Sequence, residues 1–304
     1  MSMKRHAYLI IAHHHFDMLE RLIGVLDSEH ADFYIHIDRG ANDFDEARIL
    51  GAMKKSKGKI FRKYKITWGA DTQIKCELFL MEQAIKENYD YYHLLSGVDI
   101  PLKTGKEIEA YFETQTKSFL EIKQEKDISA TLERVRYYYP LQALIGRQKA
   151  GRGWFYVLLD QLSYECVKIQ KLLHIDRTRN APFTYCRGGN WFSITHELAV
   201  HAVGCRALIR KYFYHSITAD EMFLQCVACA SPYREEIIRE NLRLVDWQRT
   251  EHGGCSPHTF TIEDYEMLTS SDRLFARKFD PDIDREIVDA LYGRLEAAKA
   301  ENYN

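Results

Sequence analysis

Residues 7–38 read AYLIIAHHHFDMLERLIGVLDSEHADFYIHID, and this stretch decides the fold. Its two ends, 7–12 and 32–38, are largely apolar runs, which is typical of parallel strands covered on both faces. Between them, apolar residues recur at helical spacing: Phe16, Leu19, Ile23 and Leu26. A strand, a helix and a second strand predict a βαβ unit, and therefore a right-handed crossover into a parallel sheet.

The alternation continues along the rest of the chain, with no repeat and no Pro- or Gly-rich linker. Later elements are expected as strands at 59–67, 89–95, 240–247 and 274–280, and as helices near 74–85 and 284–298. We therefore expect one domain, 1–304, of α/β class, with a mixed, mostly parallel sheet flanked by helices.

Composition excludes several classes of function. Lys plus Arg number 42 and Asp plus Glu 44, so a formal net charge of −2 gives no global basic field for nucleic acid. Seven cysteines, an odd number within mostly apolar segments, predict free thiols in a reducing compartment. No signal peptide is visible and no stretch approaches the ~20 apolar residues of a membrane span, so we expect a cytoplasmic protein.

Four side chains follow predicted strands and are therefore candidates for ligand binding: His13, Asp38, Trp68 and Asp99. Ligands of open α/β sheets collect at the carboxyl ends of the strands. The row His13, His14 and His15 also suggests a metal. On an extended segment, however, successive side chains alternate in direction, so we expect one or two of these histidines to line a pocket instead.

Three D-x-D strings occur, at 43–45, 280–282 and 282–284. Such carboxylates often hold a divalent cation on a nucleotide-sugar diphosphate, and the metal is expected at the end of the 89–95 strand. That strand ends with Asp99 alone, and Asp43 and Asp45 are typical of a solvated loop or a helix start. The sequence therefore predicts no metal site.

Thr218-Ala219-Asp220-Glu221 precedes an apolar run and fits the capping box S/T-x-x-E. Glu221 then has two interpretations. Its carboxylate can close the capping box at the Thr218 amide, or it can project from a helix start into a cleft as a general base.

Other residues leave two interpretations open as well. Of Arg277 and Lys278 in an extended run, one must face inward and needs an anionic partner, either Asp280, Asp282, another carboxylate or a ligand phosphate. Segment 134–139, RVRYYY, is a basic aromatic patch for an acceptor or, as we favour, a half-buried face. Trp191 and Trp247 can stack on a sugar or belong to the core.

Together, these segments resemble the core-2/I-branching β-1,6-N-acetylglucosaminyltransferase family, which includes the peptide O-xylosyltransferases. The resemblance spans nearly the whole chain in family order and is weakest at 127–180, where acceptor choice would lie. Its segments are AYLIIAH and FYIHIDR, TWGADTQIKCELFLMEQA, YYHLLSGVDIPLKT, GGNWFSITHELA, TADEMFLQ and SPHTFTIEDYEMLTSSDRLFARKFD.

The resemblance implies a GT-A-type fold that transfers a sugar, N-acetylglucosamine first, from UDP to a saccharide hydroxyl, with inversion and no metal or other cofactor. Glu221 matches the general base. Lys278, beside Arg277, matches the lysine that stabilises the departing diphosphate, and Asp38 matches a contact to uracil or ribose. Residues 1–125 would bind the nucleotide sugar, and residues 126–304 the acceptor.

The remaining expectations follow from the same resemblance. His13, Trp68 and Asp99 join the donor site, Trp191 and Trp247 the acceptor site, and the context is surface polysaccharide synthesis. The chain looks like a bacterial, cytoplasmic member, because animal members carry a membrane anchor and disulfides. Peripheral membrane association through a lipid-linked acceptor stays open, as does a non-catalytic carbohydrate- or nucleotide-binding module.

One position departs from the family pattern. Some animal members carry a second diphosphate-binding arginine, and Cys255 stands in its place here. Lys278 would then need another helper. The candidates are His258, Arg277 and Arg249.

Overall fold

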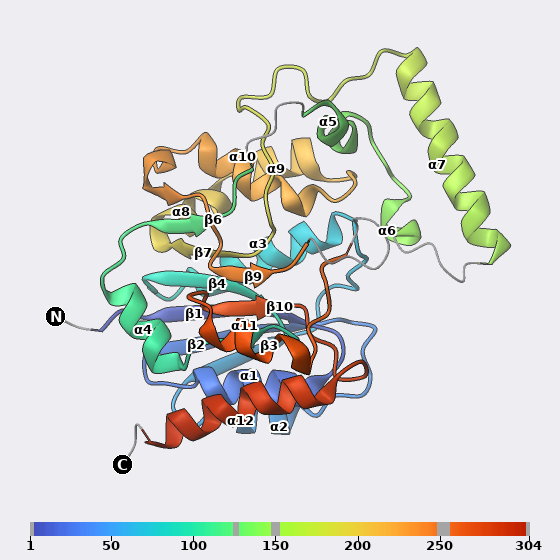
Figure 1. The fold of residues 1–304 in the computed structure, drawn as a ribbon. Helices are drawn as coiled ribbons and strands as arrows, with labels where there is room; N and C mark the ends of the chain where they lie inside the picture. The colour runs from blue at the N-terminus through green and yellow to red at the C-terminus, as the bar shows by residue number, and fades with distance from the viewer. Residues whose placement is uncertain (1–2, 124–127, 147–152, 248–255, 302–304) are drawn as a thin grey trace. The chain divides into compact units, whose positions relative to one another are not determined.

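The computed structural model describes residues 3–123, 128–146, 153–247 and 256–301. The chain forms two compact units, each assembled from separate stretches of sequence (Figure 1). Unit 1 consists of Met1–Arg62, Asn88–Thr116 and Asn241–Asn304, and unit 2 of Lys63–Glu87 and Lys117–Glu240.

The main sheet of unit 1 confirms the βαβ prediction. Its strand order is β3-β2-β1-β4, and each neighbouring pair is parallel. In this register, buried side chains stand opposite one another on neighbouring strands, for example Tyr8 opposite Phe33 and Leu9 opposite Leu94. The strands are β1 (His6–Ala12), β2 (Ala31–Ile37), β3 (Lys57–Phe61) and β4 (Tyr91–Ser96).

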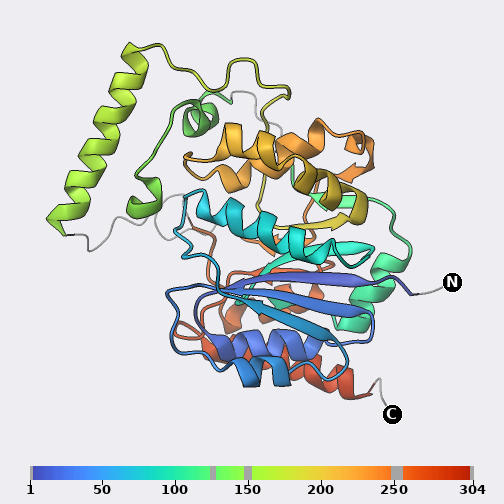
Figure 2. The same cartoon turned by 180° about the vertical axis from the view of Figure 1, so that it is seen from behind.

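Helices α1, α2 and α12 pack along one face of this sheet (Figures 1 and 2). All four predicted face residues of α1 are buried, and the Tyr292 hydroxyl of α12 donates to the Met18 carbonyl of α1 at 3.1 Å. The helices of unit 1 are α1 (Phe16–Leu26), α2 (Glu46–Gly51), α4 (Gly105–Glu113), η3 (Ile262–Asp264), α11 (Tyr265–Ser270) and α12 (Arg285–Glu301).

A second, small sheet of unit 1 carries Arg277 at the end of one strand, directly before Lys278. Its order is β5-β10-β9, with β10 parallel to β9 and antiparallel to β5. The strands are β5 (Ile100–Pro101), β9 (Arg243–Val245) and β10 (Phe275–Arg277), so Lys278 follows directly on β10.

Unit 2 is mainly helical around three short strands ordered β7-β6-β8, with β6 antiparallel to β7 and parallel to β8. Its strands are β6 (Ser118–Leu120), β7 (Phe192–Thr195) and β8 (Ile237–Ile238). Its helices are α3 (Thr72–Ala84), α5 (Ser129–Arg136), α6 (Gln142–Ile145), α7 (Trp154–Leu172), α8 (His196–Gly204), α9 (Arg206–Phe213), η1 (Ala219–Glu221), α10 (Phe223–Cys229) and η2 (Arg234–Glu236).

The α/β class with a mixed, mostly parallel sheet and flanking helices is confirmed. Three predicted strands are shorter than expected, since β3 ends at Phe61 and β9 and β10 cover three residues each. Trp68 was expected at the carboxyl end of the third strand. That expectation is wrong, because Trp68 follows the last residue of β3 by seven positions and belongs to unit 2. The functional division at 125/126 stays a prediction.

Candidate functional site

Glu221 does not cap its own helix. Thr218 has a left-handed backbone, φ 51°, in place of the extended backbone of most N-caps, and its side chain makes no cap hydrogen bond. Its amide instead donates to the Gly69 carbonyl at 2.9 Å. The capping-box interpretation of Glu221 is therefore wrong, and the carboxylate is available for another partner.

That partner is Arg134, the predicted half-buried residue at the end of α5. Arg134 Nη1 lies 2.9 Å from Glu221 Oε2, and both side chains are partly buried. Within the described residues, Oε1 of Glu221 accepts no hydrogen bond. The guanidinium thus holds one carboxylate oxygen, and the described residues make no hydrogen bond to the other. Sequence reasoning missed the pair because 87 positions separate its members.

The glycine segment before β7 holds the Glu221 backbone in place. The Gly188 amide donates to the Glu221 carbonyl at 2.9 Å, and a Cβ at Gly188 would collide with the Glu121 carbonyl oxygen. The next amide, of Gly189, donates to Glu121 Oε2 at 2.7 Å. The close approach of the Glu121 backbone explains the glycine at position 188, where no Cβ would fit.

Beneath this segment lies a buried carboxyl group. Asn190 Nδ2 donates to Glu77 Oε1 at 3.0 Å, and Glu77 is fully buried on α3. Burial, and secondarily the nearby negative charge of Asp220, raises the pKa of Glu77 well above its ordinary value. Glu77 therefore holds Asn190 in place, and the raised pKa favours the neutral form of its carboxyl group.

In unit 1, the ends of β1 and β2 meet through Asp38. Its amide donates to the Ala12 carbonyl at 2.8 Å, and its Oδ1 accepts from the Gly40 amide at 2.6 Å in a tight turn. Asp38 is buried and His13 is exposed. Both follow their strands as predicted, and their roles in donor binding stay predictions.

The histidine row is not extended. The chain bends after Ala12. The rings of His13 and His14 stack with centroids 3.9 Å apart, and the rings of His14 and His15 are tilted with centroids 4.3 Å apart. The expected alternation of these side chains is therefore wrong, because the strand has already ended. Burial and the two neighbouring imidazoles lower the pKa of His14 to about 4, so His14 is neutral at physiological pH.

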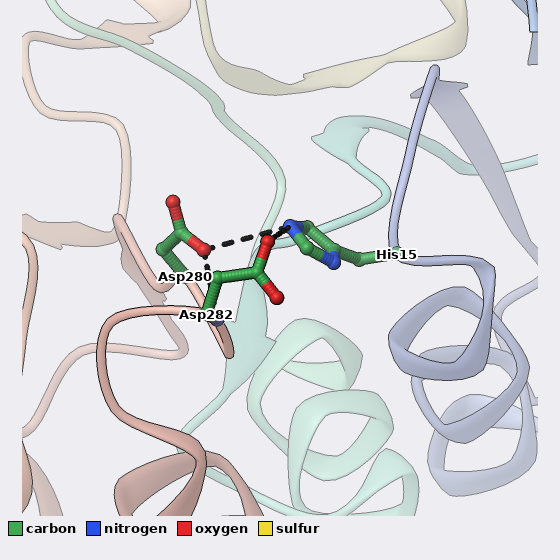
Figure 3. A group of neighbouring side chains, drawn as sticks. All are labelled: His15, Asp280 and Asp282. Atoms are coloured by element: carbon green, nitrogen blue, oxygen red, sulfur yellow. Dashed lines mark hydrogen bonds and ion pairs between the residues drawn. The ribbon is translucent and has the colours of Figure 1, made fainter.

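His15 meets two carboxylates that are remote in sequence. Its Nε2 lies 3.5 Å from Asp280 Oδ1 and 3.8 Å from Asp282 Oδ2 (Figure 3). The three ligand atoms lie within 4.8 Å of one another, and imidazole with carboxylates is a donor set that divalent cations accept. In the described residues this is the one group of three such side chains with that spacing.

A cavity of about 520 Å³ opens beside His15 and is unsuited to a diphosphate. Its lining carries more carboxylates than cations. It consists of His15, Phe16, Asp17, Glu20, Asp43, Phe44, Asp45 and Arg48. Arg48 is already paired with Glu20 at 2.8 Å, and Asp45 accepts from the Arg48 amide as the N-cap of α2, so the helix-start interpretation of Asp45 is confirmed.

The side chain of Arg277 faces an internal acid. Its Nη1 lies 3.8 Å from Asp99 Oδ1, and Asp99 is fully buried with Oδ2 on the Ser96 amide. Burial raises the pKa of Asp99, and the positive charge of Arg277 opposes that rise. Of the partners left open for the inward cation, the structure provides another carboxylate, Asp99.

A second buried cation, Arg243 of β9, acts on the same carboxylate. Its guanidinium donates to the Leu94 carbonyl at 3.1 Å, and burial lowers its pKa to about 9. The positive charges of two guanidinium groups therefore both lower the pKa of the Asp99 carboxyl, against the effect of its burial. An arginine inside the predicted 240–247 strand was the sequence feature that could have revealed it.

Lys278 is partly exposed, with its Nζ 3.4 Å from the Ser256 hydroxyl. Among the described residues, no carboxylate lies within ion-pair distance of this ammonium group. Of its candidate helpers, His258 bonds Asp264 at 3.1 Å and Arg277 faces Asp99. Cys255 and Arg249 lie outside the described residues.

The tryptophans are divided between the units. Trp68 and Trp247 are half exposed, and Trp191 is partly buried just before β7. Unit 1 thus carries His13, Asp38, Asp99, Trp247, Arg277 and Lys278, and unit 2 carries Trp68, Trp191 and Glu221. The assignments of Trp68 to the donor, and of Trp191 and Trp247 to the acceptor, stay predictions.

Known proteins resemble this chain over nearly its whole length. The family profile "Core-2/I-Branching enzyme" matches residues 6–271. Xylosyltransferase 2 of Rattus norvegicus is 24% identical over 310 aligned positions, which cover 94% of this chain and 33% of that protein. Xylosyltransferase 1 of Mus musculus is 21% identical over an alignment that covers 98% of this chain and 31% of that protein. The chain therefore spans about a third of the length of these curated relatives.

A solved structure of mouse xyloside xylosyltransferase 1 in its apo form aligns with a TM-score of 0.38 at 10% identity, covering 90% of this chain and 97% of that one. A likeness of this size carries no argument about function.

Proposed function

The chain belongs to the core-2/I-branching enzyme family, and from this premise we propose that it is an inverting glycosyltransferase. It moves a sugar from a UDP-sugar to a hydroxyl of a saccharide acceptor, without a bound metal ion. We propose N-acetylglucosamine as the sugar and surface polysaccharide synthesis as the context. Xylose is the second candidate, because the curated relatives are named xylosyltransferases.

The observation that carries the proposal is the state of Glu221. Its carboxylate is relieved of helix capping, is oriented by Arg134, and keeps Oε1 open in the described part of the chain. A general base needs this combination, since it must accept a proton at a fixed place without being consumed by a structural contact.

The reaction then proceeds by a single displacement. The acceptor oxygen attacks the anomeric carbon while its proton passes to Glu221. The bond from that carbon to the UDP oxygen breaks, and its electron pair leaves with the diphosphate. Negative charge therefore grows on the leaving group. A fixed cation at that place stabilises the transition state more than the ground state and so lowers the barrier.

We assign that cation to Lys278. Support comes from its ammonium group, which lies within ion-pair distance of no carboxylate among the described residues. Because Arg277 is already directed at Asp99, we propose that it raises the local potential while Lys278 makes the contact.

The test is UDP release from UDP-N-acetylglucosamine and UDP-xylose, with and without saccharide acceptors, in the native protein and in Glu221→Gln. We expect the variant to retain UDP affinity and to lose about 10²–10³ in kcat. Absence of sugar release from either donor would favour the non-catalytic binding module, and normal turnover of the variant would remove Glu221 from the mechanism.

A further inference from the structure

Strand β3 lies in a strongly basic stretch of the chain. Positions 54–65 read KKSKGKIFRKYK, with seven basic residues and no acidic one, in a chain of formal net charge −2. The part of this stretch that belongs to unit 1, residues 54–62, holds five of the cations, and all five are exposed. This basic row consists of Lys54, Lys55, Lys57, Lys59 and Arg62. It creates a local positive field that the near-neutral composition of the whole chain hides.

The carboxylates beside the basic row are engaged with other groups. Asp27 is buried and accepts hydrogen bonds from the backbone amides of residues 54–56, which fixes the turn before β3. Asp32, opposite Lys57 in the register of β2 with β3, accepts from the Lys57 amide at 2.8 Å and from Arg5 Nη2 at 3.0 Å. The side chains of the row that have no carboxylate of the described residues within ion-pair distance are those of Lys54, Lys57, Lys59 and Arg62.

The basic row follows the outer edge of the main sheet. β3 is the first strand in the order β3-β2-β1-β4 and pairs with β2 alone. Lys57 and Lys59 are two residues apart, so they point to the same side of the strand, about 7 Å from each other along it. At the carboxyl end of β3, Arg62 Nη2 donates to the Ala41 carbonyl at 2.6 Å, in the loop that follows Asp38. The cations therefore extend along the strand to the sheet edge where Asp38 lies.

We propose that the basic row binds an acidic polysaccharide, a linear chain that carries carboxylate groups along its length. Cations in a line along an extended strand match anions in a line along an extended polymer, and clusters of this density are typical of polyanion-binding surfaces. Lysine ammonium groups on flexible stems can follow such anions without a fixed geometry. The row is thus a surface for a long anionic saccharide.

A lipid bilayer is a less suitable occupant. Proteins that lie on an anionic bilayer combine cations with apolar side chains that enter the lipid. Ile60 and Phe61, the large apolar residues within 54–62, are half-buried and not exposed. Among the residues that the structure describes, no helix has the length and apolarity to cross a membrane.

A single-stranded nucleic acid is the other competing occupant. It stacks its bases on exposed aromatic rings, and the aromatic residue within the row, Phe61, is half-buried. A polysaccharide held through its carboxylates needs neither stacking nor apolar insertion at this surface. The inference goes beyond the proposed function, because unit 1 can hold such a chain whether or not that chain receives the sugar.

The experiment is a binding titration of the full chain at low salt with a fluorescently labelled oligosaccharide of galacturonic acid. A neutral dextran oligomer, a single-stranded DNA and vesicles of phosphatidylcholine with phosphatidylglycerol are the other probes. We expect the acidic oligosaccharide to bind, the neutral one not to bind, and the affinity to fall with rising salt. The double variant Lys57→Glu/Lys59→Glu should lose about tenfold or more in affinity, and Lys57→Gln/Lys59→Gln should lose less.

The matched control is Lys86→Glu/Lys106→Glu, which changes the net charge equally at two exposed lysines outside the row and should bind as the native protein does. Circular dichroism shows whether each variant is folded. Unchanged affinity of a folded Lys57→Glu/Lys59→Glu overturns the inference.

No binding of the native protein to the acidic oligosaccharide also overturns it, and would leave these lysines the role of keeping an edge strand from pairing with other chains. Tighter binding of the DNA or of the vesicles would assign the row to another class of partner and overturn it as well. No donor is present, and Glu221→Gln should bind normally, so a failure here leaves glycosyl transfer standing and a failure of transfer leaves this result unaffected.

Discussion

Arg134 Nη1 lies 2.9 Å from Glu221 Oε2, and this ion pair joins the end of α5 to the short helix η1. An ion pair with both partners partly exposed contributes little to stability, typically about 0–1 kcal/mol. Its consequence is positional, since it selects one rotamer of the carboxylate. We therefore place Arg134 as a positioning residue for the proposed base.

The first prediction concerns that role. Arg134→Met should lower kcat about tenfold or more with little change in donor KM, because the base loses its orientation while the donor contacts stay. Arg134→Lys should recover part of kcat. Arg136→Met, on the same helix and paired with Glu133, is the control. Steady-state kinetics decide, and a loss confined to the melting temperature would make the pair structural.

A second prediction isolates the proposed diphosphate cation. Lys278→Met should cost about 10²–10³ in kcat and weaken UDP binding, because developing charge on the leaving group loses its counter-ion. Lys86→Met, an exposed lysine on the loop after α3, should behave as the native protein. Calorimetric titration with UDP and initial rates are the readouts. Native turnover in Lys278→Met would contradict the assignment.

The third prediction is a pH dependence of stability from Glu77. Its pKa is raised in the folded chain, so between the unfolded value of 4.5 and the raised folded value the unfolded chain loses this proton more readily, and stability falls as pH rises through that interval. Glu77→Gln keeps a hydrogen-bond acceptor for Asn190 and removes the titrating carboxyl group that makes stability depend on pH. The variant should therefore gain over the native protein in urea unfolding at about pH 8, by more than at about pH 5. An equal difference at both values would mean that Glu77 ionises normally.

The fourth prediction has the opposite sign. His6 is buried against His93, Nδ1 to Nε2 3.0 Å, and burial lowers its pKa from 6.5 to about 4. As the pH falls, the imidazole of the unfolded chain is protonated before that of the folded chain. The contribution of His6 to the free energy of unfolding is therefore fully present above pH 6.5 and is lost as the pH drops toward 4. His6→Asn, whose side-chain amide stands where Nδ1 of His6 stands, should flatten this slope in the same unfolding assay. An unchanged slope would assign acid sensitivity to other groups.

What the sequence could predict is the local part of the structure. The apolar runs at 7–12 and 32–38 and the helical face of Phe16, Leu19, Ile23 and Leu26 encode their elements within a few turns of chain, and each forms as expected. The ends of weak edge elements were less determined, as the short β3 shows, because edge pairing rather than pattern decides where such a strand stops.

The sequence could not predict the contacts between residues that are distant along the chain. The TADE pattern alone favours a capping box, and the left-handed backbone of Thr218 and the arrival of Arg134 from α5 overrule it. Asp280 and Asp282 lie beside His15 although more than 260 positions of sequence separate them from it. Pairings of this kind depend on tertiary packing, which single-sequence periodicity does not carry.

The central claim is that a side-chain cation, and not a divalent metal, neutralises the departing diphosphate. It is tested most directly by initial rates of UDP release with and without EDTA, in the native protein and in Asp282→Asn, which removes one of the three side chains able to hold a cation. The account predicts rates that neither the chelator nor this substitution changes. Loss of turnover in EDTA that added Mn²⁺ restores in the native protein but not in Asp282→Asn would contradict it.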